Sequence, residues 1–204
     1  GGAMGNNSCG AHSIVYGKTV DHVKEMKIVL PDGTITKILE LTSDQFASKK
    51  KLPGLEGSIY REIMSIASSN KHEIEKRFPK ILRRVGGYNL DLIQDQKSLN
   101  MTNLMVGSEG TLASVCSARL NLEPLPAFKG LAIIHFENIK EAMEATVKIL
   151  EQNPVAVEHI GEMILNQARN SIGFSRNLGF LQGNPSDILV VEMIGETQKE
   201  VDSK

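Results

Sequence analysis

The alternation of apolar and polar residues near the start of the chain predicts a β-hairpin. From Val23 to Leu30, apolar side chains come to occupy every second position, which is typical of a strand with one buried face. Pro31-Asp32-Gly33 is a turn sequence, because proline and glycine supply the backbone angles that tight turns need. The residues from Thr34 to Leu39 then predict the returning strand.

The next segment predicts a loop followed by two helices. Residues 42–57 are polar and contain glycine and proline, which is typical of a loop. Ser58 is the expected N-cap of a helix with an apolar stripe at helical spacing. The stripe consists of Ile59, Ile63, Ile66 and Ala67. A second short helix should end at Pro79, because proline cannot continue a helix. Residues 80–103 are predicted to be irregular, and residues 112–122 to form a strand.

The two prolines in Glu123-Pro124-Leu125-Pro126 predict a domain boundary, and a β-α-β pattern follows them. The predicted strands are Leu131–Phe136, Ala156–Ile160 and Ile188–Ile194. The predicted helices cover 139–150 and 162–172, and a further helix begins near the end of the chain. Asn138 and Glu141 resemble a capping box at the start of the first of these helices. We therefore expect an α+β chain with two domains, 1–124 and 125–204.

Composition and charge argue against several classes of protein. The 204 residues are 41% hydrophobic and 23% charged, as in ordinary globular proteins. A formal net charge of −1 argues against a nucleic-acid-binding protein. No stretch approaches the roughly 18 apolar residues of a membrane span. Cys9 and Cys116 form neither a disulfide framework nor a metal-binding pattern, so a cytoplasmic location is the default expectation.

Two glycine-containing segments carry the candidate chemistry. Residues 1–17 combine five glycines with Asn6, Asn7 and Ser8, and they are expected to be neither strand nor helix. Residues 107–111 repeat the theme before a strand. Such loops can press their backbone against a flat or anionic ligand, although each alone is also consistent with an ordinary turn. Neither matches the dinucleotide-binding fingerprint, and no Walker-type lysine follows either of them.

Three motifs resemble those of FAD-linked oxidases of the vanillyl-alcohol-oxidase (PCMH) superfamily. They are GGAMGNNSCGAHSIVYGKTVDHV, FPKILRRVGGYNLD and LMVGSEGTLASV, and their order and spacing also match. The resemblance covers residues 1–125. In detail, the motifs are most similar to bacterial flavin modules of the D-2-hydroxyacid dehydrogenase type, related to D-lactate dehydrogenase and glycolate oxidase. Those modules are joined to a C-terminal iron–sulfur module.

The resemblance implies an architecture and an activity. Residues 1–124 would be the C-terminal part of a PCMH-type FAD-binding domain, an antiparallel sheet with flanking helices. Residues 125–204 would be the N-terminal part of a ferredoxin-like cap domain. A D-2-hydroxy acid such as lactate, glycolate or 2-hydroxyglutarate would be oxidised by hydride transfer to the flavin, with an unspecified electron acceptor. The location would be cytoplasmic, or peripheral to a membrane in a longer parent protein.

The resemblance also implies which residues contact the flavin. They are Asn6, Asn7, Ser8, Cys9, Gly10, Glu109, Gly110, Thr111, Leu112, Ala113 and Val115. Glycine would let the backbone approach the ring, and Ala113 stands where many relatives carry glycine. The family's pyrophosphate loop and its histidine-rich motif have no match in this sequence. No catalytic residue is therefore assigned. The chain is expected to be a fragment that alone binds FAD weakly or not at all and is inactive by itself.

Two alternative functions remain open. The chain could be a purely structural fragment without flavin, or part of a related flavoenzyme that acts on another alcohol, such as an ether-lipid synthase relative. Cys9 could link a flavin covalently, or it could be a small packing residue. His12 could bind the flavin or substrate, or only pack within its loop.

The roles of five further residues also stay open. Glu158 and His159 lie on a predicted strand of the cap, where they could face an active site or an edge of the sheet. Arg83 and Arg84, together with Tyr88, could help to place the adenine half of the cofactor. Structural hydrogen bonds are the alternative for these three.

Overall fold

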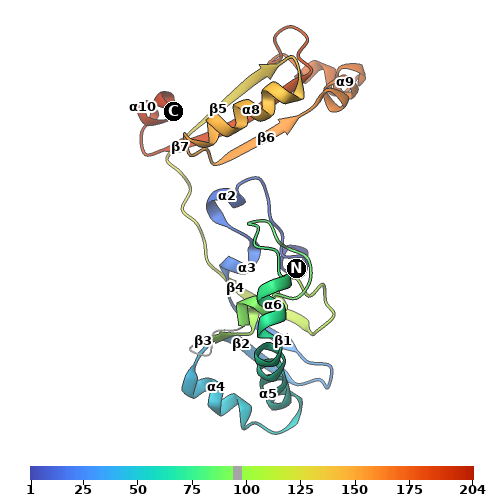
Figure 1. Ribbon diagram of the computed structural model, residues 1–204, viewed down its shortest axis with the longest axis vertical. Helices are drawn as coiled ribbons and strands as arrows, with labels where there is room; N and C mark the ends of the chain where they lie inside the picture. The colour runs from blue at the N-terminus through green and yellow to red at the C-terminus, as the bar shows by residue number, and fades with distance from the viewer. Residues whose placement is uncertain (94–97) are drawn as a thin grey trace. The chain divides into compact units, whose positions relative to one another are not determined.

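The computed structural model describes residues 1–93 and 98–204, and these form two compact units (Figure 1). The first unit spans Gly1–Glu123 and the second spans Pro124–Lys204. Along the sequence, the boundary between the units therefore lies within the proline-containing segment. Each unit combines an antiparallel sheet with helices, so the α+β class is confirmed.

The sheet of the first unit has the strand order β3-β2-β1-β4, and all its strand pairs are antiparallel. Its strands are β1 (Val23–Val29), β2 (Ile35–Thr42), β3 (Ser98–Asn100) and β4 (Ser114–Leu120). The predicted hairpin is confirmed, since Met26 lies opposite Ile38 and Ile28 lies opposite Thr36. All four of these side chains are buried, so one face of the hairpin forms part of the core.

The prediction of a loop over 42–57 is wrong. Helix α4 (Ser43–Lys50) begins after Thr42, whose side chain accepts a hydrogen bond from the Gln45 backbone. The Gln45 side chain accepts in return from the Thr42 N–H, so the two residues form a capping box. None of the side chains of α4 is buried, which is why no apolar pattern announced this helix.

The main helix of the first unit, α5 (Gly54–Ser69), begins five residues before the expected first helical residue, Ile59. Its N-cap is Pro53, so the prediction of Ser58 as N-cap is wrong. Ile63 and Ala67 of the predicted stripe are buried against the sheet, whereas Ile66 is 46% exposed. The short helix α6 (Lys71–Arg77) ends before Pro79 as predicted.

Short helical pieces interrupt two segments that were expected to be irregular. Residues 1–17 contain the single turns α1 (Gly2–Gly5) and α2 (Ser13–Tyr16), and a third turn, α3 (Thr19–His22), follows them. Local backbone hydrogen bonds form these turns despite the glycines; for example, Gly5 N–H donates to Gly1 O at 3.1 Å. Residues 80–103 contain a 3₁₀ helix (Leu90–Ile93), β3 and the start of α7 (Thr102–Met105). Positions 94–97 of that prediction lie outside the described residues.

The second unit is a split β-α-β arrangement. Its sheet has the order β5-β7-β6, with β5 (Phe128–Phe136) and β6 (Ala156–Ile160) both antiparallel to β7 (Asp187–Gly195). Helix α8 (Ile139–Leu150) connects β5 to β6, and α9 (Glu162–Asn170) follows β6. The last helix is α10 (Gln198–Ser203). The strands and helices predicted for this unit are confirmed, apart from small differences at their ends.

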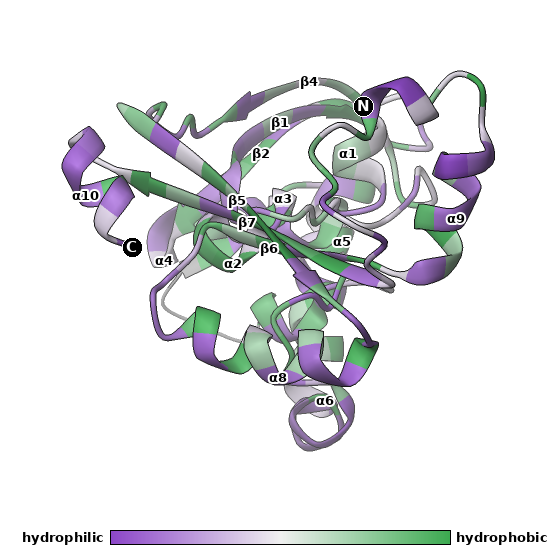
Figure 2. Ribbon diagram, turned by 90° about the horizontal axis from the view of Figure 1, so that it is seen from above, coloured by the Kyte–Doolittle hydropathy of each residue, from purple (hydrophilic) through white to green (hydrophobic). Residues whose placement is uncertain are grey.

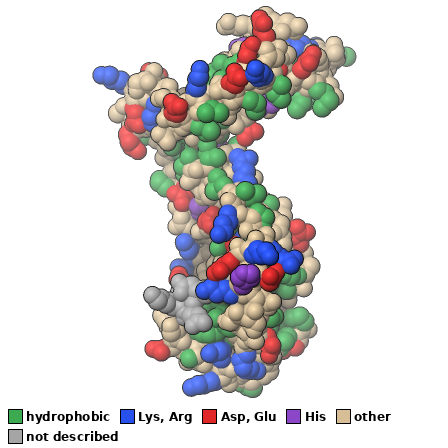
Figure 3. Space-filling view, viewed as in Figure 1, with side chains coloured by type: hydrophobic (Ala, Val, Ile, Leu, Met, Phe, Trp, Pro, Cys, Tyr) green, Lys and Arg blue, Asp and Glu red, His purple; other side chains and the backbone are tan. Residues whose placement is uncertain are grey.

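Strand β7 is the centre of the second core. It is mostly hydrophobic along its length (Figure 2), and Leu189, Val191 and Met193 pack on one face against Ala142 of α8. Asn138 caps α8, because its side-chain oxygen accepts from the Glu141 N–H at 3.0 Å. No helix among the described residues is long and apolar enough to cross a membrane. On the face shown in Figure 3, positive and negative side chains are interspersed.

Candidate functional site

The structure places the two glycine segments next to each other, although about a hundred residues separate them in the sequence. Gly107 N–H donates to Met4 O, and Glu109 N–H donates to Gly5 O, both at 2.9 Å. A Cβ on Gly107 would lie 3.4 Å from the Asn7 Cβ, which is a close approach. The residues of the two motifs therefore form one continuous surface.

The buried side chain of Asn7 ties the first of these segments to Val20. Its side chain is 0% exposed, and its Oδ1 accepts a hydrogen bond from the Val20 N–H at 3.0 Å. Its backbone has a φ of 52°, in the left-handed region that asparagine tolerates better than most residues. The Asn7 side chain thus points into the protein, and any contact of Asn7 with a cofactor would use its backbone.

The second segment turns sharply at Glu109 and Gly110. Their φ angles are 50° and 77°, and Thr111 N–H donates to Ser108 O at 3.0 Å, which is the pattern of a type I′ turn. The Thr111 hydroxyl donates to the same oxygen at 2.5 Å. Since that uses its single proton, the Tyr88 hydroxyl must donate in the 2.8 Å contact between Tyr88 and Thr111. The turn is therefore held from two sides.

A pocket of about 310 Å³ lies between the two segments. Gly1, Met4, Gly5, Met105, Ser108, Gly110, Ala113, Ser114 and Val115 line it. None of these lining side chains carries a charge. In addition, a Cβ on Gly10 or on Gly110 would meet no heavy atom of the described residues within 4 Å, so both glycines face open space.

Sequence reasoning found only part of this lining. Of the predicted cofactor contacts, Gly110, Ala113 and Val115 line the pocket. Asn6, Ser8, Cys9, Gly10, Glu109 and Thr111 lie in the same two segments but outside its lining. Leu112 packs against the core of the first unit instead. The lining residues that were missed, such as Met4 and Ser108, follow from the contact between the segments, and no pattern in either segment alone reveals them.

In the motif FPKILRRVGGYNLD, residues 78–91, the hydrogen bonds of Arg84 favour a structural role. Both oxygens of Asp91 accept hydrogen bonds from its guanidinium at 2.7 Å, and its side chain is 10% exposed. Arg83 donates to Ala11 O at 3.4 Å and so connects this motif to the first glycine segment. In this motif, therefore, the arginine hydrogen bonds connect parts of the protein to one another.

In the second unit, His159 pairs with Asp187. The two side chains are 2.7 Å apart, on the edge strand β6 and the central strand β7. Ser186 donates to the same carboxylate, and this hydrogen bond, followed by the contact with His159, holds the pKa of Asp187 below its usual value. Glu158 is exposed. Among the described residues, no group of three or more His, Cys, Asp or Glu could hold a metal ion.

The first glycine segment matches a known family. Residues 1–39 match the model of the FAD binding domain. This range includes Asn6 to Gly10 of the predicted cofactor contacts and excludes the 109–115 group.

The chain as a whole is distantly related to D-2-hydroxyglutarate and D-lactate dehydrogenases. It is 28% identical over 208 residues to D-2-hydroxyglutarate dehydrogenase of Pantoea ananatis, covering 99% of this chain and 20% of that protein. The Escherichia coli protein of the same name is 27% identical, with coverage of 100% and 21%. A probable mitochondrial D-lactate dehydrogenase of Danio rerio is 26% identical, with coverage of 81% and 24%. The chain thus spans about a fifth of the length of these relatives.

Solved structures agree on the fold. Two structures of alkyldihydroxyacetonephosphate synthase match all of this chain and 29–30% of their own, with TM-scores of 0.54 and 0.55. At a sequence identity of 15–16%, this similarity supports a shared fold only and carries no information about activity.

Proposed function

We propose that the two glycine segments form one wall of an FAD site in an oxidoreductase that oxidises D-2-hydroxy acids. The observation that carries this proposal is the pocket between them. One side belongs to the segment that matches the FAD binding domain, and the other contains the Gly-Ser-Glu-Gly-Thr turn. The remaining wall, the substrate contacts and the electron acceptor would lie outside the residues assigned here.

The lining suits the ring end of FAD. A flat aromatic ring system needs a surface without projecting side chains, and glycines supply it while their amides can donate hydrogen bonds. Met4 and Met105 add polarizable apolar contacts, and Ser108 and Ser114 add hydroxyls that can reach the polar edge of a ring. The diphosphate would need cations or a helix N-terminus, and no lining side chain is charged.

The chain's own residues would bind and orient the cofactor. Gly10 and Gly110 would allow close approach, and Tyr88 and Asn7 would hold the two segments in place. When bound, FAD would supply the two-electron chemistry that side chains lack. The second unit would be part of a ferredoxin-like cap, an assignment that its β5-β7-β6 order supports.

The substrate class rests on the relatives, several of which are named for D-2-hydroxyglutarate or D-lactate. A second candidate is an ether-lipid synthase, favoured only by the fold similarity. Adding D-2-hydroxyglutarate, D-lactate or L-lactate, without oxygen, to an FAD-loaded longer protein that contains this chain separates the possibilities. Loss of the flavin band at about 450 nm with a D-2-hydroxy acid alone supports the first proposal. If no hydroxy acid bleaches the band, the substrate class is wrong.

The cofactor site is tested by NMR titration of the chain with FAD. We expect weak binding, because no side chain in the lining offers a positive charge to the diphosphate, and we expect amide shifts confined to residues 1–10 and 105–115. Gly110→Ala should weaken binding about fivefold, the equivalent of about 1 kcal/mol. Gly33→Ala is the matched control, because Gly33 also has a positive φ (85°) and open space around its missing Cβ.

Gly10→Ala offers a second comparison that is free of backbone strain. Gly10 has no positive φ, and a Cβ on it would meet no heavy atom of the described residues within 4 Å. The same is true of Gly179 in the second unit. We expect Gly10→Ala to weaken FAD binding and Gly179→Ala to leave it unchanged. Cys9→Ser should keep the flavin, because we assign that side chain a packing role. Equal affinity in Gly110→Ala and Gly33→Ala would mean that the turn does not contact the ring.

A further inference from the structure

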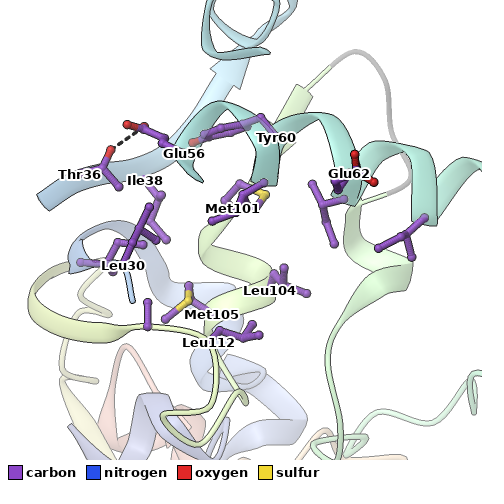
Figure 4. Close-up of a pocket in the computed structure, with 15 residues that line it drawn as sticks. Leu30, Thr36, Ile38, Glu56, Tyr60, Glu62, Met101, Leu104, Met105 and Leu112 are labelled. Atoms are coloured by element: carbon purple, nitrogen blue, oxygen red, sulfur yellow. Dashed lines mark hydrogen bonds between the residues drawn. The ribbon is translucent and has the colours of Figure 1, made fainter. Parts of the chain in front are cut away.

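The second glycine segment, residues 107–111, comes shortly after a buried single turn of helix, α7 (Thr102–Met105). Leu104 and Met105 of α7 line an apolar cavity of about 240 Å³ between α5 and the sheet, so this helix belongs to the core (Figure 4). The last carbonyl groups of a helix have no partner within the helix, and burying them without a donor is costly. A hydrogen-bond donor is therefore needed at the C-terminal end of α7, directly before the glycine segment.

Asn89 supplies this donor. Its side chain is buried, and its Nδ2 donates to Asn103 O and to Val106 O, both at 3.0 Å. Its Oδ1 accepts a hydrogen bond from Arg84 Nη1 at 3.2 Å. Because arginine only donates and a backbone oxygen only accepts, these contacts permit one orientation of the Asn89 amide. Asn89 thus holds Val106, the residue before the glycine segment, in one position.

The orientation of Asn89 depends in turn on an ion pair. Arg84 Nη2 donates to both carboxylate oxygens of Asp91 at 2.7 Å. Hydrogen bonds between charged groups are stronger than those between neutral groups. A guanidinium with so little exposure to water is also costly to leave unpaired, so Asp91 fixes the position from which Arg84 contacts Asn89.

Tyr88, which precedes Asn89 in the sequence, holds the other end of the glycine segment. Its hydroxyl donates to Thr111 Oγ1 at 2.8 Å. Between these two ends, the backbone of Gly107 packs closely, since a Cβ on it would lie 3.5 Å from Gly87 O. The stretch that contains Tyr88 and Asn89 therefore contacts the second glycine segment at both of its ends.

The Gly110 N–H is the part of this segment that is available to a ligand. The N–H groups of residues 107, 108, 109 and 111 donate to backbone oxygens of the protein. The Gly110 N–H has no acceptor within the described residues, and Gly110 lines the pocket between the two glycine segments. A donor serves a ligand well only when its position is fixed to within about 0.5 Å.

We propose that Tyr88 and Asn89 are positioning residues of the candidate FAD site. They hold the two ends of the second glycine segment and so fix the Gly110 N–H for the cofactor. Arg84 and Asp91 act through Asn89, and no contact between these four side chains and FAD is needed. The choice of ligand rests on the proposed function, whereas the hold on the segment exists without a ligand.

Amide hydrogen exchange of the chain without FAD tests this hold. Asn89→Ala leaves the end of α7 without its donor, so the N–H groups of Gly107 and Glu109 should exchange about tenfold faster. The amides of β1 and β2 should exchange as in the wild type, because the loosening is local. Circular dichroism is the folding control.

Two further variants make the exchange test decisive. Tyr88→Phe removes only a hydroxyl, so it tests the other end of the segment even if Asn89→Ala does not fold, and the Thr111 N–H should exchange about threefold faster. Thr36→Val is the matched control. It also removes a hydrogen bond of a buried side chain in the first unit, the 2.6 Å bond from Thr36 to Glu56 that is dashed in Figure 4. It should leave the exchange of the glycine segment unchanged.

Titration with FAD then tests the consequence for binding. Asn89→Ala should weaken FAD binding about fivefold and Tyr88→Phe about threefold, whereas Thr36→Val should bind as the wild type does. The proposal is wrong if both variants of the motif exchange like the wild type, or if faster exchange leaves the affinity for FAD unchanged. A wild type that binds no FAD would overturn the proposed cofactor, and the exchange rates would still decide whether Tyr88 and Asn89 hold the segment.

Discussion

Replacing Asn7 tests the idea that a buried side chain supports the candidate site. In Asn7→Ala, the Val20 N–H loses its partner at a buried position, which costs about 1–3 kcal/mol. Alanine must also adopt the φ of 52°, and left-handed backbone costs about 1 kcal/mol for a residue with a Cβ. We therefore expect the free energy of unfolding of the first unit to fall by about 2–4 kcal/mol.

Asn7→Gly separates the two contributions. Glycine accepts the positive φ without strain but also lacks the side-chain oxygen, so the expected loss is about 1–3 kcal/mol. Alanine should thus be the more damaging replacement by about 1 kcal/mol, which reverses the order usual in helices.

Tyrosine fluorescence during urea unfolding measures this effect. All three tyrosines, Tyr16, Tyr60 and Tyr88, belong to the first unit, and the chain has no tryptophan, so the signal reports that unit alone. A loss below about 0.5 kcal/mol in both variants would show that the hydrogen bond to Val20 is unimportant. If Asn7→Ala is no worse than Asn7→Gly, the strain argument fails.

Three further predictions concern the fold and its response to pH. Gly57→Ala should strongly destabilise α5 in urea unfolding, because its Cβ would lie 1.9 Å from Leu52 O; an unchanged midpoint would contradict the geometry. Since the pKa of Asp187 is lowered by Ser186, its contribution to the stability of the second unit should be present above about pH 4 and lost as the pH falls further. Amide hydrogen exchange in β7, the strand that contains Asp187, should become faster as the pH falls below that value. The variant Asp187→Asn should lack this pH dependence. Limited proteolysis should cut first near residues 123–126 or within 173–184, and early cleavage only inside the hairpin or α8 would argue against two units.

Local patterns predicted the elements whose cause is local. The hairpin of β1 and β2 follows from the alternation of apolar residues around Pro31-Asp32-Gly33, and α8 follows from its cap and its apolar spacing. Strand β6 lies at the predicted Ala156–Ile160. Helix α4 was missed because its side chains are not buried, although its Thr42–Gln45 capping box is visible in the sequence.

Only the tertiary structure decided how distant segments combine. The sequence indicated two glycine segments, but the hydrogen bonds from Gly107 to Met4 and from Glu109 to Gly5 join residues about a hundred positions apart, which only the folded unit brings together. The same holds for the burial of Asn7, which depends on Val20, and for the insertion of β7 between β5 and β6. Periodicity along a chain reports which face of an element is apolar. The neighbour of that face is selected by packing and hydrogen bonding over the whole unit.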